Sequence, residues 1–204
     1  HLVNQLMDVR KIKTGNIDLK ASKTDIVKFL ENISQPFSSL ARQKNIDYDF
    51  IADRKSIPAW VDTEKLEIIF YNLVSNAIKF TPEHGQISVA ISLIGSESIH
   101  ELEEKVAIVK QKETCNRYVS IIVSDSGIGI ECDQLKDIFK RFYKIPIDYN
   151  KHSYGTRIGL YLTKELIKVH RGWLFAKSTT GYGSDFICLL PYGKEYLKEN
   201  EISE

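Results

Sequence analysis

One helical stretch with an unusual polar stripe constrains this chain more than any other feature. The stretch is Asn72-Leu-Val-Ser-Asn76-Ala-Ile-Lys79-Phe-Thr-Pro. In a helix, Asn72, Asn76 and Lys79 lie at i, i+4 and i+7, which places two amides and an ammonium on one side. The apolar residues gather on another side and predict the face that packs into a core: Leu66, Ile69, Phe70, Leu73, Val74 and Ala77.

The polar stripe suits a magnesium complex of a nucleoside triphosphate. An amide oxygen can ligate a hard cation such as Mg²⁺, and a lysine ammonium can pair with phosphate oxygens. The other interpretation is a polar helix face exposed to water. Taken alone, this helix fits the second interpretation better, so a further motif is needed to decide.

That motif is Asp125-Ser-Gly127-Ile-Gly129-Ile, directly after the β-branched run Tyr118-Val-Ser-Ile-Ile-Val, which predicts a buried strand. The Asp125 carboxylate offers only acceptors, so it can bind the exocyclic amine of adenine, whereas guanine presents a carbonyl there. Gly127 and Gly129 let the backbone approach a flat ring. A strand-end turn is the ordinary explanation of this motif by itself. Its combination with the Asn72–Lys79 helix predicts an adenine nucleotide site.

With these motifs in place, the chain from about Asp62 to Pro191 resembles the ATP-binding domain of sensor histidine kinases. The helix motif matches the family's Asn box, and the Asp125 motif matches its first glycine box. Three more boxes follow in the family order: Ile138-Phe139-Lys-Arg-Phe142-Tyr-Lys144, Gly155-Thr-Arg-Ile-Gly159-Leu160 and Gly181-Tyr-Gly183-Ser-Asp-Phe186. A chance match of five ordered boxes is very improbable.

The resemblance implies a fold and a set of site residues. The expected fold is α+β, a two-layer α/β sandwich of the Bergerat type with helices on one face of a mixed sheet. ATP and Mg²⁺ are the expected cofactors, with Asn76 as the metal ligand. Lys144 could equally be a solvated lysine. The residues implied to bind ATP are Asn72, Asn76, Lys79, Asp125, Gly127, Gly129, Phe139, Lys144, Gly155, Thr156, Gly159 and Leu160.

The implied activity is that of a protein histidine kinase, which transfers the γ-phosphoryl group of ATP to a histidine on a dimerisation helix. None of the five histidines lies in the family's H-E-x-R-T-P pattern, so the acceptor is not in this chain. Asn72 stands where gyrase-type relatives have a water-activating glutamate, and an amide is no general base. Arg157 replaces a glycine of the family pattern. The alternative is therefore a non-catalytic nucleotide-sensing or scaffold module with a degenerate second glycine box.

The same resemblance divides the chain and implies its partners. Residues 1–15 are expected to end a dimerisation helix, 16–192 to form the catalytic domain, and 193–204 to form a solvated linker. The stretch 95–117 is expected to be a long polar hairpin insertion, with a short helix inside it as an open alternative. Pro36 is expected to kink or break a helix over 25–43. The implied setting is a cytoplasmic domain of a homodimeric parent, a hybrid kinase anchored in the inner membrane. Its implied partners are the dimerisation helices and a receiver domain or response regulator.

Composition excludes several other classes. Lys and Arg number 28 against 27 Asp and Glu, and no basic block or nucleic-acid motif occurs, so no nucleic-acid partner is expected. Cys115, Cys132 and Cys188 are too few and too scattered for a disulfide framework or a zinc site.

Overall fold

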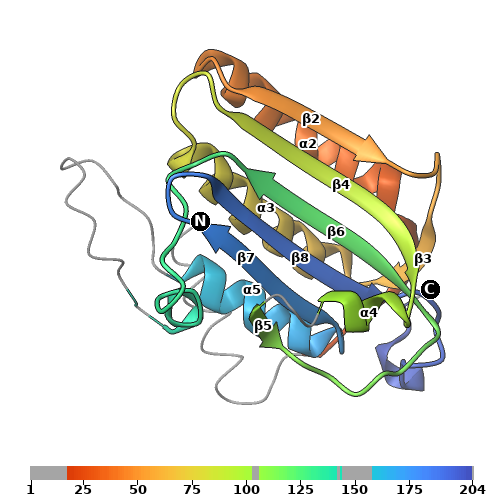
Figure 1. The fold of residues 1–204 in the computed structure, drawn as a ribbon. Coiled ribbons are helices and arrows are strands. Elements are labelled where there is room, and N and C mark those ends of the chain that lie inside the picture. The colour runs from red at the N-terminus through yellow and green to blue at the C-terminus, as the bar shows by residue number, and fades with distance from the viewer. Residues whose placement is uncertain (1–17, 103–105, 142, 144–157, 204) are drawn as a thin grey trace.

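Alternating apolar residues build a mixed sheet whose two faces differ. In a computed structural model that describes residues 18–102, 106–141, 143 and 158–203, the strands of this sheet lie in the order β2-β4-β6-β8-β7-β5 (Figure 1). β2 is parallel to β4, and the other neighbours are antiparallel. The strand bounds are β2 Asp47–Ala52, β4 Gln86–Gly95, β5 Val106–Val109, β6 Arg117–Asp125, β7 Trp173–Thr179 and β8 Gly183–Pro191.

The long helices α2 (Ile26–Gln43), α3 (Thr63–Phe80) and α5 (Gly159–Val169) cover one face of this sheet (Figure 1). Their apolar sides and the strand residues that face them form one continuous core. This arrangement confirms the expected α+β fold with helices on one face of a mixed sheet. At Pro36 a kink or a break was expected; the break is wrong, because α2 runs through this residue, and a kink stays a prediction. Buried residues on both sides of the proline, Leu30 and Phe37, hold the helix against the core.

The 95–117 stretch does more than form a polar hairpin. β5 joins the edge of the main sheet by pairing with β7, and the short helix α4 (Ser98–Glu101) lies near the strand face that α2, α3 and α5 leave open (Figure 1). Ile99 packs there against a second apolar cluster that includes Tyr118, Trp173 and Phe175. The alternative of a short helix within the insertion is confirmed by α4, and the pairing of β5 with β7 is a contact that the sequence did not predict. The described part of the insertion extends the sheet, and its short helix packs on part of the second sheet face.

A second, smaller sheet joins β1 (Ser22–Asp25) to β3 (Pro58–Val61), and short 3₁₀ turns occur at η2 (Asp137–Phe139) and η3 (Glu199–Glu201). The tail after Pro191 is not simply solvated, since Tyr196 is 8% exposed and packs with Leu19 and Ala21. The expectation of a solvated linker is wrong for this residue. No helix within the described ranges is long and apolar enough to cross a membrane.

Candidate nucleotide site

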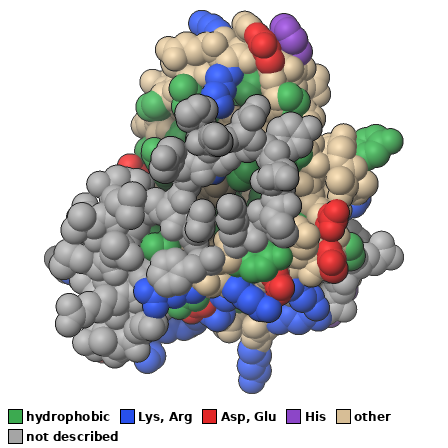
Figure 2. Space-filling model, turned by 90° about the vertical axis from the view of Figure 1, so that its left-hand side faces the viewer, with side chains coloured by type: hydrophobic (Ala, Val, Ile, Leu, Met, Phe, Trp, Pro, Cys, Tyr) green, Lys and Arg blue, Asp and Glu red, His purple; other side chains and the backbone are tan. Residues whose placement is uncertain are grey.

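Several predicted site residues meet at one end of the molecule, where α3 and β6 end and α5 begins (Figure 1). α3 begins at Asp62, whose carboxylate accepts a hydrogen bond from the Lys65 N–H as an N-cap. α3 and α5 pack against each other, and Asn72, the first residue of the Asn box, contacts the start of α5. Figure 2 faces this end and shows Lys and Arg side chains gathered on its lower part among the described residues.

Asn72 fixes the start of α5. Its side chain is 5% exposed, and its Nδ2 donates a hydrogen bond of 3.2 Å to the Gly159 carbonyl oxygen. A Cβ at Gly159 would lie 2.9 Å from Asn72 Oδ1, so a side chain there would press on this amide. The sequence pattern indicated a ligand at Asn72. The contact shows that the amide also joins the two helices, and direct binding of ATP by Asn72 stays a prediction.

Asn76 and Lys79 lie one and two turns beyond Asn72 on the same helix side. Both are half-buried, and Lys79 Nζ lies 4.9 Å from the centroid of the Phe80 ring. No group of three or more His, Cys, Asp or Glu side chains within the described ranges could hold a metal ion. An amide oxygen of Asn76, completed by phosphate oxygens and water, still fits Mg²⁺, which keeps several waters and takes few protein ligands.

Asp125 ends β6 in a half-buried position. Its Oδ1 accepts a hydrogen bond of 2.9 Å from the Gly127 N–H. Burial raises the pKa of Asp125 to about 6, the Gly127 N–H opposes this rise, and the nearby Asp185 carboxylate adds to it. A carboxylate that is poorly solvated gains more than an exposed one from a ligand N–H, which suits it to the exocyclic amine of adenine.

The glycine loop after Asp125 is held between α3 and the β7–β8 turn. The Ile128 N–H donates to the Phe80 carbonyl at 3.3 Å, and the Gly181 N–H donates to the Ile128 carbonyl at 2.8 Å. Gly129 has a φ of +68°, and a Cβ there would collide with the Thr179 carbonyl oxygen. Glycine is therefore required at 129 for both its backbone conformation and its close contact.

Phe139 lies in the core rather than at the surface of the site. It is 1% exposed and meets Phe186 edge-on, with ring centroids 6.1 Å apart. Lys164 Nζ donates a hydrogen bond of 3.0 Å to the Phe139 carbonyl and so ties the phenylalanine box to α5. Sequence reasoning missed Lys164, because no local spacing links it to residue 139. A direct contact of Phe139 with ATP stays a prediction.

The remaining predicted residues divide into two groups. Leu160 lies in the first turn of α5, half-buried against the core. Lys144, Gly155 and Thr156, and also Arg157, lie outside the described residues. The described site therefore contains the Asn box, the first glycine loop and the beginning of α5.

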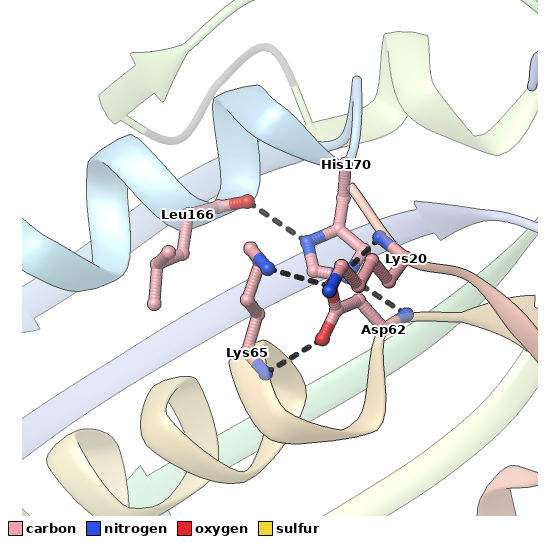
Figure 3. Close-up of polar contacts among 5 residues, drawn as sticks. All are labelled: Lys20, Asp62, Lys65, Leu166 and His170. Carbon is pink, nitrogen blue, oxygen red and sulfur yellow. Dashed lines mark hydrogen bonds and ion pairs between the residues drawn. The ribbon is translucent and has the colours of Figure 1, made fainter. Parts of the chain in front are cut away.

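A buried polar cluster joins the first residue before α3 to the residue after α5, at the ends of these helices that lie away from the candidate site (Figure 3). His170 is fully buried; its Nδ1–H donates to the Leu166 carbonyl at 2.9 Å, and its Nε2 accepts from the Asp62 N–H at 3.4 Å. The imidazole is therefore neutral, and burial lowers its pKa despite these hydrogen bonds and the nearby Asp62 carboxylate. Asp62 Oδ2 also accepts from Lys65 Nζ at 2.6 Å and from the Lys20 N–H at 2.9 Å.

His170 is expected to make folding stability depend on pH. Its pKa is depressed in the folded chain, so the stability it supports is complete above the unfolded value of about 6.5 and is lost as the pH falls below it. The loss has a limit of about 1.4 kcal/mol per pH unit for one proton. Urea unfolding at several pH values, compared with His170→Gln, measures it.

Both chains of this comparison, the one with His170 and the His170→Gln variant, should also carry Asp125→Asn, so that the titration of Asp125 does not contribute. The raised pKa of Asp125 gives the opposite trend, stability rising as the pH falls from about 6 towards 4. His84→Asn is the control, because His84 is exposed and Asn tolerates its φ of +65°. An unchanged slope in His170→Gln would contradict the prediction.

Comparisons with known proteins agree with this geometry. A family model described as "Histidine kinase-, DNA gyrase B-, and HSP90-like ATPase" matches residues 61–194. The chain belongs to this family. It is 34% identical to Histidine kinase P4 of Formosa agariphila over 98% of this chain and 13% of that protein. It is also 34% identical to the sensor histidine kinase TmoS of Ectopseudomonas mendocina, over 98% of this chain and 19% of that protein.

Solved structures show the same fold. Full-length ShkA in complex with AMPPNP has a TM-score of 0.73 at 22% identity, covering 94% of this chain and 35% of that chain. The histidine kinase ThkA in complex with the response regulator TrrA has a TM-score of 0.66 at 21% identity, covering 96% and 49%. Within its family, the chain is an ATP-binding catalytic domain of the histidine kinase type. It spans less than a fifth of the length of the curated relatives given above.

Proposed function

We propose that the chain binds Mg-ATP at the end where α3, β6 and α5 meet, and transfers the γ-phosphoryl group to a histidine on a dimerisation helix of its parent protein. The observation that carries the proposal is the Asn72–Gly159 hydrogen bond. It directs the side of α3 that bears Asn76 and Lys79 towards the beginning of α5. The names of the relatives, which are histidine kinases, support the same activity.

Each described site residue has a role in this proposal. Asp125 binds the adenine amine, Asn76 ligates Mg²⁺, and Lys79 meets phosphate oxygens. Mg²⁺, when bound, would neutralise charge on the phosphates. The N–H groups at the start of α5 favour negative charge, because the helix dipole is positive there. Asn72 is buried, bound to Gly159 and unable to act as a base, so the site holds ATP without activating water.

The transfer itself is a substitution at phosphorus. A ring nitrogen of the acceptor histidine attacks the γ-phosphorus, and the new P–N bond forms as the P–O bond to ADP breaks. The electron pair of the broken bond stays on ADP, and the imidazole loses its N–H proton to solvent. Phosphoryl transfer depends mainly on positioning and charge stabilisation, which are what a site without a general base provides.

The proposal is tested by comparing the chain alone with the chain mixed with a protein that carries the acceptor histidine. Alone with Mg-ATP, it is expected to bind nucleotide, to hydrolyse it slowly and to remain unphosphorylated. With a protein that carries the dimerisation helices, it should form an acid-labile, base-stable phosphoramidate on that partner. Radiolabelled transfer, lost when the acceptor histidine is changed, measures this. Brisk ATP turnover by the chain alone would contradict the proposal. Binding without transfer, by both the native chain and Arg157→Gly, would favour the nucleotide-sensing alternative.

A second prediction concerns the metal. Asn76→Ala should remove the Mg²⁺-dependent part of ATP affinity, because it deletes the proposed ligand. Asn72→Ala should weaken binding with and without metal, because it loosens the start of α5. Calorimetric titration of each variant, with Mg²⁺ and with a chelator, separates the two. If the chelator changes binding to Asn76→Ala as much as binding to the native chain, Asn76 is not the ligand.

The partners of the parent follow from the same proposal. Dimerisation helices would form a homodimer, and a receiver domain or response regulator would take the phosphoryl group from the histidine. A relative of 28% identity is named a hybrid signal transduction histidine kinase, and the structural neighbour ThkA is seen with a response regulator. Anchoring of the parent in the inner membrane, with this domain in the cytoplasm, is part of the proposal.

A further inference from the structure

Two segments from opposite ends of the chain lie together, away from the nucleotide site. The Ala21 N–H donates to the Glu201 carbonyl at 2.7 Å, and the Ser203 N–H donates to the Ala21 carbonyl at 2.8 Å. Ala21 and Ile202 form an isolated parallel bridge. Figure 1 shows the C-terminal segment at the end where α3 begins, opposite the end of β6. We call residues 193–203 the C-terminal strap.

Side chains hold the strap against the domain. Arg171, directly after α5, forms an ion pair of 2.8 Å with Glu201, and the side chains are 26% and 15% exposed. The hydrogen bond from Arg171 lowers the pKa of Glu201. Tyr196 Oη donates a hydrogen bond of 2.6 Å to the Trp60 carbonyl, and its ring is buried against Leu19. These contacts are mostly buried, so water and salt screen the ion pair less than they screen a surface pair.

Residues 20 and 21 contact the strap on one side, and on the other side Lys20 is hydrogen-bonded to the beginning of α3. The Lys20 N–H donates to Asp62, which caps α3, and the Asp62 N–H donates to His170 after α5 (Figure 3). The chain at Lys20 and Ala21 is thus fixed between the strap and the ends of α3 and α5. α3 has 18 residues, so these contacts lie about 27 Å from its other end, near the phosphates.

The contacts that hold Lys20 and Ala21 between the C-terminal strap and the helices set where the chain enters the domain. Residues 1–15, predicted to end a dimerisation helix, enter through residues 18–21. If that entry point were loose, an acceptor histidine joined through it would reach the phosphate in many orientations. We propose that Arg171, Glu201 and Tyr196 are positioning residues for transfer in cis. This inference rests on the proposed function.

The experiment compares transfer in cis with transfer in trans. For cis transfer, the chain is joined through residues 1–17 to its dimerisation helices. For trans transfer, the chain is mixed with a separate protein that carries those helices. Arg171→Glu and Glu201→Arg should each lower the cis rate by roughly ten- to a hundredfold. The trans rate and the affinity for Mg-ATP should not change. The double reversal, Arg171→Glu with Glu201→Arg, should restore most of the cis rate.

Glu199→Gln is the matched control, because Glu199 is an exposed carboxylate in the same strap, and it should leave both rates unchanged. Tyr196→Phe removes only the hydroxyl and should lower the cis rate alone. An unchanged cis rate in the single reversals overturns the inference. Equal losses in cis rate, trans rate and affinity overturn it too, since they show a structural role only. No transfer by the unchanged chain to either acceptor overturns the proposed function, and this inference with it.

Discussion

Replacing Asp125 with Asn is expected to weaken the binding of adenine nucleotides by roughly tenfold or more, because a hydrogen bond to a charged group is worth about 1.5–3 kcal/mol. The amide can still accept the Gly127 N–H with its oxygen, and then its NH₂ group faces the adenine amine as a second donor. Guanine nucleotides should bind the variant no worse than the native chain. The preference for ATP over GTP, measured by calorimetry, should therefore fall.

The pH dependence of affinity provides an independent check. Because the pKa of Asp125 is about 6 in the chain, its carboxylate becomes protonated as the pH falls through this value, and adenine affinity should fall with it. Binding near pH 6 should release a proton, seen as a dependence of the binding enthalpy on the buffer. The nucleotide phosphates also titrate, so the same titrations with Asp125→Asn isolate the contribution of Asp125. Equal affinity of the native chain for ATP and GTP would remove Asp125 from the site.

The other large effect is expected on replacing Gly183, whose backbone lies directly against the Asp125 carbonyl group. Gly183 has a φ of +111°, and a Cβ there would collide with the Asp125 carbonyl oxygen. Gly183→Ala should lower stability by about 2–5 kcal/mol, since a left-handed backbone costs about 1–2 kcal/mol and overpacking adds about 1–3 kcal/mol. Displacing the end of β6 should also weaken nucleotide binding.

Gly181→Ala is a matched control two residues away. Gly181 also has a positive φ, +82°, but a Cβ there would meet nothing within 4 Å. This variant should lose only the backbone contribution of about 1–2 kcal/mol and keep its nucleotide affinity. Thermal unfolding should place Gly183→Ala several degrees below Gly181→Ala, at about 2–4 °C per kcal/mol for a chain of this size. Similar melting temperatures would show that contact with Asp125 is unimportant.

Local patterns in the sequence predicted the parts of the fold that depend on near neighbours. The apolar side of α3 is confirmed, because helix periodicity involves residues within a few positions. The strand before Asp125 is confirmed for the same reason. Pro36 shows the limit of this reasoning, because α2 is continuous where the local rule left a kink or a break open, and buried residues on both sides of the proline hold the helix against the core.

Contacts between distant segments could not be predicted in this way. The order of the family boxes indicated a common site, yet the pairing of Asn72 with Gly159 spans 87 positions and has no local signal. The same is true of Lys164 with the Phe139 carbonyl and of His170 with Asp62. The polar composition of the tail indicated solvent exposure, whereas Tyr196 packs against residues from the other end of the chain.

The pairing of β5 with β7 has a consequence for self-association. Without β5, the seven residues of β7 would form an open sheet edge that begins with Trp173, Leu174 and Phe175. Such long apolar edges invite strands from other copies and promote aggregation. β5 replaces that edge with one of four residues, a length too short to be a good template. The strand β5 of the 95–117 insertion thus shortens the edge on this side of the sheet, and β2 forms the opposite edge.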